Sequence, residues 1–183
     1  DLQFGANDVP TQVNQIENMI ANGCKVLVIA AIEGDSLGTV LAQAKEKNIP
    51  IREEAFMKYG EKITFFPGVE TYFERINAYA ASKNIHLEHF IISSGLREFV
   101  KGTAIGKYFK TIYASGFQYD DNGCACWPAL VVNYTNKTQF LFRINKGIYN
   151  SYDNTLINKS MPEDERAVPF SNFIYIGDGE TDV

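Results

Sequence analysis

Two aspartates near the carboxyl end of the sequence are spaced to share a metal ion. Asp178 and Asp182 are four residues apart and follow the apolar run 173–176 and Gly177. The run predicts a strand buried on both faces, and the glycine permits a sharp turn after it. Carboxylates at the end of a parallel strand lie where open α/β sheets bind ligands, and the pair suits Mg²⁺. The alternative is an acidic cap of a following helix, and the short motif fits both interpretations.

Two other segments carry groups suited to an anion. Ser93, Ser94 and Gly95 follow a predicted strand, 87–92, where hydroxyl and backbone N–H groups can hold an oxyanion or a phosphate. A serine cap with a glycine turn is the commoner meaning of this tripeptide. Lys137 stands in the first turn of a later predicted helix, where a cation opposes the helix dipole. The placement predicts an anionic partner for Lys137, with an exposed surface lysine as the alternative.

Composition limits the class of protein. The chain has 183 residues, of which 45% are hydrophobic and 21% charged, as expected for a globular chain with one sizeable core. The net charge of −5, without a basic stripe, argues against a nucleic-acid partner. No apolar run reaches membrane-spanning length and no signal sequence is recognisable, so we expect a cytoplasmic protein without membrane contact. Its three cysteines suggest neither a disulfide framework nor a zinc site.

Strands and helices alternate along most of the sequence. Asp8 before Val-Pro predicts a helix start, the apolar run 25–31 predicts a buried strand, and a further helix is expected near Pro67. Asp-Asp-Asn-Gly at 120–123, between β-prone segments, predicts the turn of a hairpin. The fold class we expect is α/β: three layers, with a mostly parallel sheet and helices on both faces, plus a β-hairpin near 117–132.

The first quarter of the sequence resembles a known family. The run NDVPTQVNQIENMIANGCKVLVIAAIEGDSLGTVLAQAKEKNIPI, within residues 1–51, is similar to the amino lobe of periplasmic sugar-binding receptors. The resemblance implies a βαβα unit whose polar residues at strand ends line a sugar cleft between two lobes. Because the facing lobe is absent, one wall alone cannot enclose a ligand, and no sugar-binding residue is assigned.

The remainder, about residues 56–183, resembles the haloacid-dehalogenase-like phosphohydrolases. The similarity is carried by FFPGV, IISSG, TNKTQ and FIYIGDGETD, in that order. It implies that Ser93 and Lys137 are catalytic, with Ser93 bonding the transferred phosphoryl group and Lys137 neutralising its charge. Ser94 and Gly95 would complete the phosphate site, and the partner would be a small phosphorylated molecule.

The same resemblance implies Mg²⁺ as cofactor, held by Asp178 with support from Asp182. The sequence nevertheless lacks the D-x-D-G-T motif that supplies the nucleophile of that family. Aligning strand 25–31 with the missing strand places Ala31 at the nucleophile position, and whether Glu33 or Asp35 replaces it stays open.

Together the resemblances predict a chimera with two units, 1–51 and 52–183, which one sheet can hold because both use parallel strands. The chain starts within a predicted strand and stops where a helix should begin, so we expect a piece of a longer protein. The predicted function is a Mg²⁺-dependent phosphomonoester hydrolase, impaired or inactive without its nucleophile. The alternatives are an engineered or recombined fold without catalytic function and a remnant sugar-binding module. The sequence specifies neither the substrate nor the oligomeric state.

Overall fold

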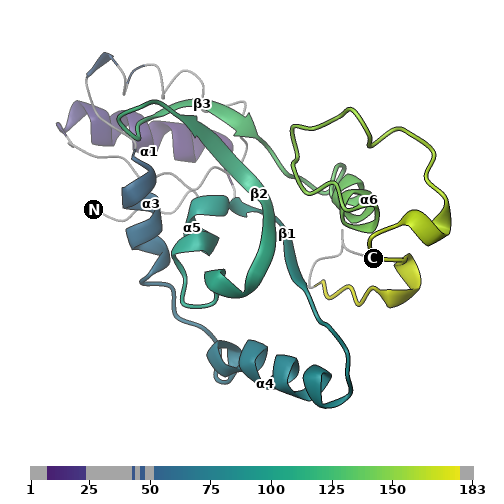
Figure 1. Cartoon of the computed structure of the whole chain (residues 1–183). Helices are drawn as coiled ribbons and strands as arrows, with labels where there is room; N and C mark the ends of the chain where they lie inside the picture. The colour runs from purple at the N-terminus through teal and green to yellow at the C-terminus, as the bar shows by residue number, and fades with distance from the viewer. Residues whose placement is uncertain (1–7, 24–42, 44–45, 48–51, 178–183) are drawn as a thin grey trace.

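The chain is a mixed α/β protein, as predicted (Figure 1). The computed structural model describes residues 8–23, 43, 46–47 and 52–177. Predictions for strand 25–31, for Glu33 and Asp35, and for Asp178 and Asp182 lie outside these ranges. Within them, no helix is both long and apolar enough to span a bilayer.

The elements follow one another in the order α1, α3, α4, β1, α5, η2, β2, β3, α6, η3 and η4. Their bounds are α1 Val9–Ala21, α3 Glu53–Gly60, α4 Val69–Ser82, β1 His89–Leu96, α5 Arg97–Gly102, η2 Gly106–Tyr108, β2 Phe109–Tyr119, β3 Ala125–Leu130, α6 Thr138–Lys146, η3 Glu163–Glu165 and η4 Phe170–Asn172.

The described strands form one sheet in the order β1-β2-β3, with β1 parallel to β2 and β2 antiparallel to β3. The turn between β2 and β3 is closed by the side chain of Asp120. Its Oδ1 accepts the N–H groups of Asn122, at 2.9 Å, and of Cys124, at 2.8 Å. Gly123 adopts φ +71°, which glycine reaches without strain. The predicted hairpin is therefore confirmed.

Helix starts also follow the sequence. The Asp8 side chain accepts the N–H of Thr11 at 2.9 Å and caps α1, and Pro10 occupies the first turn. Helix α4 begins directly after Gly68, as expected from the segment around Pro67.

Two glycines let α3 and α5 approach closely. A Cβ added to Gly60 would lie 2.3 Å from the Phe99 carbonyl oxygen, and one added to Gly102 would lie 2.1 Å from that of Met57. Both distances are far below van der Waals contact, so only glycine fits at this crossing.

A first core cluster joins α1 to elements later in the chain. Phe56 is fully buried, and its ring lies 5.7 Å from that of Phe99 and stacks 5.8 Å from that of Phe117. The buried members of the cluster are Ile16, Ile20, Phe56 and Leu96. Because α1 supplies two of them, the amino-terminal segment shares its core with the rest of the protein.

A second core cluster lies between the sheet and α6. Phe140 of α6 stacks on Tyr113 of β2, with ring centroids 4.7 Å apart. The buried members are Tyr113, Val132, Phe140 and Ile144. In Figure 1, α3 and α5 lie on one side of β1 and β2 and α6 lies on the other, so helices cover both faces as predicted.

The structure contradicts one predicted strand. Residues 173–177 form no strand, and the side chains of Ile174 and Ile176 are 85% and 80% exposed. Apolar, β-branched composition suits burial between helix layers, but a strand also needs a neighbour for its backbone. The described residues supply no such neighbour, so only Phe173 packs against a core cluster.

Candidate functional site

The carboxyl end of β1 carries the serines predicted to bind an anion. Ser93 Oγ accepts the N–H of Gly95 at 3.1 Å, so this hydroxyl closes a local turn. Ser94 is exposed, and its carbonyl oxygen accepts the hydroxyl of Ser115 on β2 at 3.1 Å. Ser115 Oγ also accepts the N–H of Val132 at 3.0 Å. This one side chain therefore ties together the end of β1, β2 and the loop that leads to α6.

The loop before α6 is built by side-chain hydrogen bonds. Asn136 Oδ1 accepts the N–H of Asn133, and Asn136 Nδ2 donates to the Val131 carbonyl, both at 2.9 Å. The Thr135 hydroxyl donates to Asn133 Oδ1 at 2.6 Å. Thr135 and Asn136 therefore close this turn and do not cap α6. Lys137 is the residue preceding α6 and is half-buried.

Ser115 thus links Ser94 at the end of β1 to Val132, at the start of the loop that leads to Lys137. The hydrogen bonds described above hold the chain itself together. The anion role expected of residues 93–95 and of Lys137 stays a prediction.

The Mg²⁺ prediction rests on Asp178 and Asp182, which lie beyond the described ranges. Among the residues that the structure does describe, no group of three or more His, Cys, Asp or Glu is arranged to hold a metal ion.

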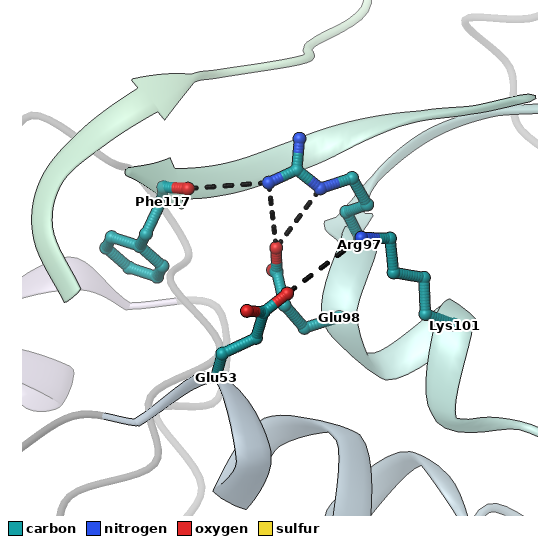
Figure 2. A network of polar contacts seen from close by, with 5 residues as sticks. All are labelled: Glu53, Arg97, Glu98, Lys101 and Phe117. Atoms are coloured by element: carbon teal, nitrogen blue, oxygen red, sulfur yellow. Dashed lines mark hydrogen bonds and ion pairs between the residues drawn. The ribbon is translucent and has the colours of Figure 1, made fainter. Parts of the chain in front are cut away.

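A buried ion pair lies deeper in the protein, between α5 and β2. Arg97 Nε and Nη2 donate to Glu98 Oε1 at 3.1 and 2.9 Å, and Nη2 also donates to the Phe117 carbonyl at 3.4 Å (Figure 2). Glu98 is fully buried. A Cβ on Gly116 would lie 3.0 Å from the guanidinium, so glycine leaves room for it against β2.

Two further groups extend this network. Lys101 of α5 approaches Glu53 of α3 at 3.9 Å, and Figure 2 shows this pair beside the Arg97–Glu98 pair. Burial, and then the charge of Glu98, raise the pKa of the Tyr119 hydroxyl. Burial by itself lowers the pKa of Arg97, but the charge and hydrogen bonds of Glu98 outweigh it and leave the pKa raised.

The network fixes α5 against the hairpin rather than presenting a reactive group. Both Arg97 nitrogens that bond Glu98 are engaged within the protein, and desolvated charges of this kind persist only when paired. Nothing in the sequence indicated this network, because a glutamate between Arg97 and Phe99 on a short helix is typical of an exposed position. Its burial results from β2 crossing over α5, a contact distant in sequence.

The contacts within the described residues do not by themselves indicate a function, whereas the similarity of the chain to known proteins does. Residues 1–52 match the family described as periplasmic binding protein domain. Over 51 residues the chain is 51% identical to the multiple sugar-binding periplasmic receptor ChvE of Rhizobium radiobacter and to the multiple sugar-binding periplasmic protein SbpA of Azospirillum brasilense. Each alignment covers 28% of this chain and 14% of the relative.

The longer alignments have a lower percentage identity. An uncharacterized protein of Borreliella burgdorferi is 30% identical over 146 residues, which covers 70% of this chain and 50% of that protein. A solved ABC transporter solute binding protein from Clostridium phytofermentans, with bound β-D-glucose, is 29% identical and covers 83% of this chain and 50% of its own. Its TM-score of 0.29 is too low to indicate a shared fold. The chain therefore spans about half the length of these two proteins.

These findings overturn the predicted phosphohydrolase. The relatives ChvE and SbpA are named as sugar-binding proteins, and the family that matches residues 1–52 is that of periplasmic binding proteins, not of hydrolases or phosphatases. The motifs that suggested one are short, and the Ser-Gly and Asp-rich turns within them also serve as caps in many α/β proteins. Ser93 shows this directly, because its hydroxyl caps Gly95.

The expected cytoplasmic location is also wrong, because the relatives matched by the amino-terminal segment are periplasmic proteins. The resemblance of residues 1–51 to periplasmic sugar-binding receptors is the part of the sequence interpretation that the comparisons support.

Proposed function

We propose that this chain is a periplasmic sugar-binding module in which the amino-terminal segment supplies one wall of the sugar site. The observation that carries the proposal is the 51% identity over 51 residues to multiple sugar-binding receptors, within the family match to residues 1–52. The partner is accordingly a monosaccharide. A resemblance of this strength over a short segment supports a shared ligand class rather than a particular sugar.

The amino-terminal segment is held to the rest of the chain by packing. We propose the division into residues 1–51 and residues 52–183, with the second unit holding the first in place through the shared first core cluster. Small-molecule sites are concave and bury most of the ligand surface, so polar side chains of the first unit would form part of such a site.

The test is a thermal-shift series with pentoses and hexoses and with a zwitterionic amino acid of similar size as control. A ligand that binds only the folded state raises the melting temperature in a saturable way. We expect at least one aldose to do so and the amino acid to have no effect. Melting temperatures unchanged by every sugar would refute the proposal.

A pair of variants separates the sugar site from general effects. Asp35 follows the apolar run 25–31 in sequence, where the family carries polar residues at strand ends, and Asp35→Asn removes a charged hydrogen-bonding group. Hydrogen bonds to charged groups contribute roughly 1.5–3 kcal/mol, so binding should weaken at least about tenfold. Asp121→Asn, an exposed change in the hairpin turn, is the matched control and should bind as the parent does.

A further inference from the structure

Two cysteine thiols lie close together on one strand of the hairpin. Cys126 belongs to β3, and Cys124 stands two residues before it, where its backbone forms an antiparallel bridge with Arg52. Side chains two residues apart on an extended chain point to the same face. Cys126 is exposed, Cys124 is half-buried, and both are free thiols. The pair is therefore open to a ligand that approaches this face of the hairpin from solvent.

Hydrogen bonds hold the backbone around Cys124. Its N–H donates to Asp120 Oδ1 at 2.8 Å, and its carbonyl oxygen accepts the N–H of Asp120 at 2.9 Å. The carbonyl oxygen of Gly123 accepts the N–H of Glu53 at 3.1 Å, and Figure 1 shows the turn of the hairpin beside the start of α3. Both the hairpin and α3 thus fix this part of the chain, and the fold sets the spacing between the two cysteines.

That spacing does not suit a disulfide. A strand rises about 3.3–3.4 Å per residue, so the Cβ atoms of two residues on the same face are about 6.7 Å apart. A disulfide needs its Cβ atoms about 3.5–4.5 Å apart. Closing the bond between Cys124 and Cys126 would move the backbone against the hydrogen bonds that hold it. Both thiols therefore stay available in the folded chain.

The same spacing suits one metal ion placed between the two sulfurs. Two metal–sulfur bonds of about 2.3 Å separate the sulfurs by up to about 4.6 Å. Rotation about the Cα–Cβ bonds brings the two sulfurs to this separation without moving the backbone. Cys126 Sγ donates to the Gln118 carbonyl oxygen at 3.2 Å, and because a thiol is a weak donor, this bond opposes the rotation little.

The number of ligands selects the metal. Thiolates favour soft or borderline metals, among them Cu(I), Zn²⁺ and the iron of iron–sulfur clusters. Structural zinc and iron–sulfur clusters take four protein ligands. Within the part of the chain that the structure describes, no third His, Cys, Asp or Glu joins the pair in a metal-binding arrangement. Cu(I) is the ion of this class that two thiolates hold by themselves, in linear geometry.

The charges around the pair must accommodate two thiolates. With one Cu(I), the two thiolates carry a net charge of −1. Arg52 Nη1 donates to the Asn122 carbonyl oxygen at 3.0 Å, so a cation lies at the same end of the hairpin. Asp120 opposes a further negative charge, but its Oδ1 accepts the N–H groups of Asn122 and Cys124. The charges of the metal ion and of Arg52 together offset those of the thiolates.

We propose that Cys124 and Cys126 form a two-coordinate site for Cu(I). Each sulfur releases its proton to solvent and forms one bond to the metal, and the copper, supplied as Cu(I), keeps its oxidation state. The site lies outside residues 1–51, to which the sugar site is assigned. Loss of sugar binding and loss of copper binding are therefore separate outcomes.

A competition titration tests the site. The reduced full chain is titrated without oxygen against Cu(I) held by a coloured chelator, and the fall in absorbance gives the stoichiometry and the affinity. We expect one copper ion per chain. Because each cysteine supplies one of only two bonds, Cys124→Ser and Cys126→Ser should each weaken the affinity by at least about 100-fold. Cys24→Ser, at the third cysteine of the chain, is the matched control and should bind as the parent does. An unchanged affinity in either of the first two variants, or an equal loss in the control, would overturn the proposal.

Two measurements on the unmodified chain need no variant to fold. X-ray absorption at the copper edge should show two sulfur neighbours, and a third ligand would contradict a two-coordinate site. Mass spectrometry after mild oxidation should show no disulfide between Cys124 and Cys126. A peptide that contains both cysteines and has lost two hydrogens would contradict the spacing on which the site depends.

Discussion

Replacing Ile16 with alanine should destabilise the whole chain and not only its amino-terminal helix. Ile16 of α1 is 4% exposed and packs in one cluster with Phe56 and Leu96, which belong to later elements. The change removes three carbon atoms, worth about 0.8 kcal/mol each on burial, and leaves a cavity that raises the cost further. We therefore expect a loss of about 3 kcal/mol, a large part of the 5–15 kcal/mol typical of a folded domain.

Urea unfolding followed by two probes checks this. Far-ultraviolet circular dichroism reports on the helices, and fluorescence reports on Trp127, the single tryptophan, on β3. Because α1 and the hairpin contribute to one cluster, both transitions should coincide and shift together in Ile16→Ala. Asn18→Ala, on the exposed face of α1, is the matched control and should change stability by less than about 0.7 kcal/mol. Separate transitions, or a shift in the dichroism alone, would refute a shared core.

Three further outcomes are expected. Gly102→Ala should cost about 3 kcal/mol or more in urea unfolding, because its Cβ would lie 2.1 Å from the Met57 carbonyl oxygen, and a neutral result would contradict the close approach of α3 and α5. Phe140→Ala should cost roughly 3–5 kcal/mol, since it empties a site that is 1% exposed and stacked on Tyr113, and a cost below about 1 kcal/mol would argue against that packing. Burial raises the pKa of Tyr113 to about 12 from an ordinary value of 10, so the folded state keeps a proton that the unfolded state loses. Stability should therefore fall as the pH rises from 10 towards 12, and ultraviolet titration showing this tyrosine ionising near pH 10 in the folded protein would contradict its burial.

Local features of the fold could be predicted from the sequence. The Asp8 cap of α1 and the hairpin turn around Asp120 both depend on residues within four positions of one another. Their hydrogen bonds form from neighbouring residues whatever the rest of the chain does. The predicted types of these elements were correct, and the predicted boundaries differed from the observed ones by a few residues, as at the start of α6.

Features that depend on distant residues were not predictable. The apolar run 173–176 has the composition of a buried strand. Backbone pairing, however, needs a neighbouring strand, and the residues of the run do not specify one. Glu98 has the composition of a surface position, yet β2 covers it and Arg97 pairs with it. In both cases the local sequence pattern predicted one environment for the residues, and the tertiary contacts placed them in a different one.

For the candidate site, too, one prediction from the sequence is supported and another is not. The similarity of the first 51 residues to sugar receptors extends over a continuous segment, and the comparisons support it. The phosphohydrolase resemblance rested on four short motifs separated by dissimilar chain. Short turn motifs such as that of Ser93 recur in many folds, because glycine permits tight turns and the serine hydroxyl bonds the backbone within them. Such motifs therefore indicate a turn more strongly than a catalytic reaction.

The most direct measurement of the central claim is a calorimetric titration of the full chain with single monosaccharides. We predict a saturable heat for at least one pentose or hexose, with one site per chain. The heat should disappear or weaken at least about tenfold in Asp35→Asn and persist in Asp121→Asn. Heats no larger than dilution for every sugar, at concentrations well above the millimolar range, would contradict the assignment of a sugar-binding function to this protein.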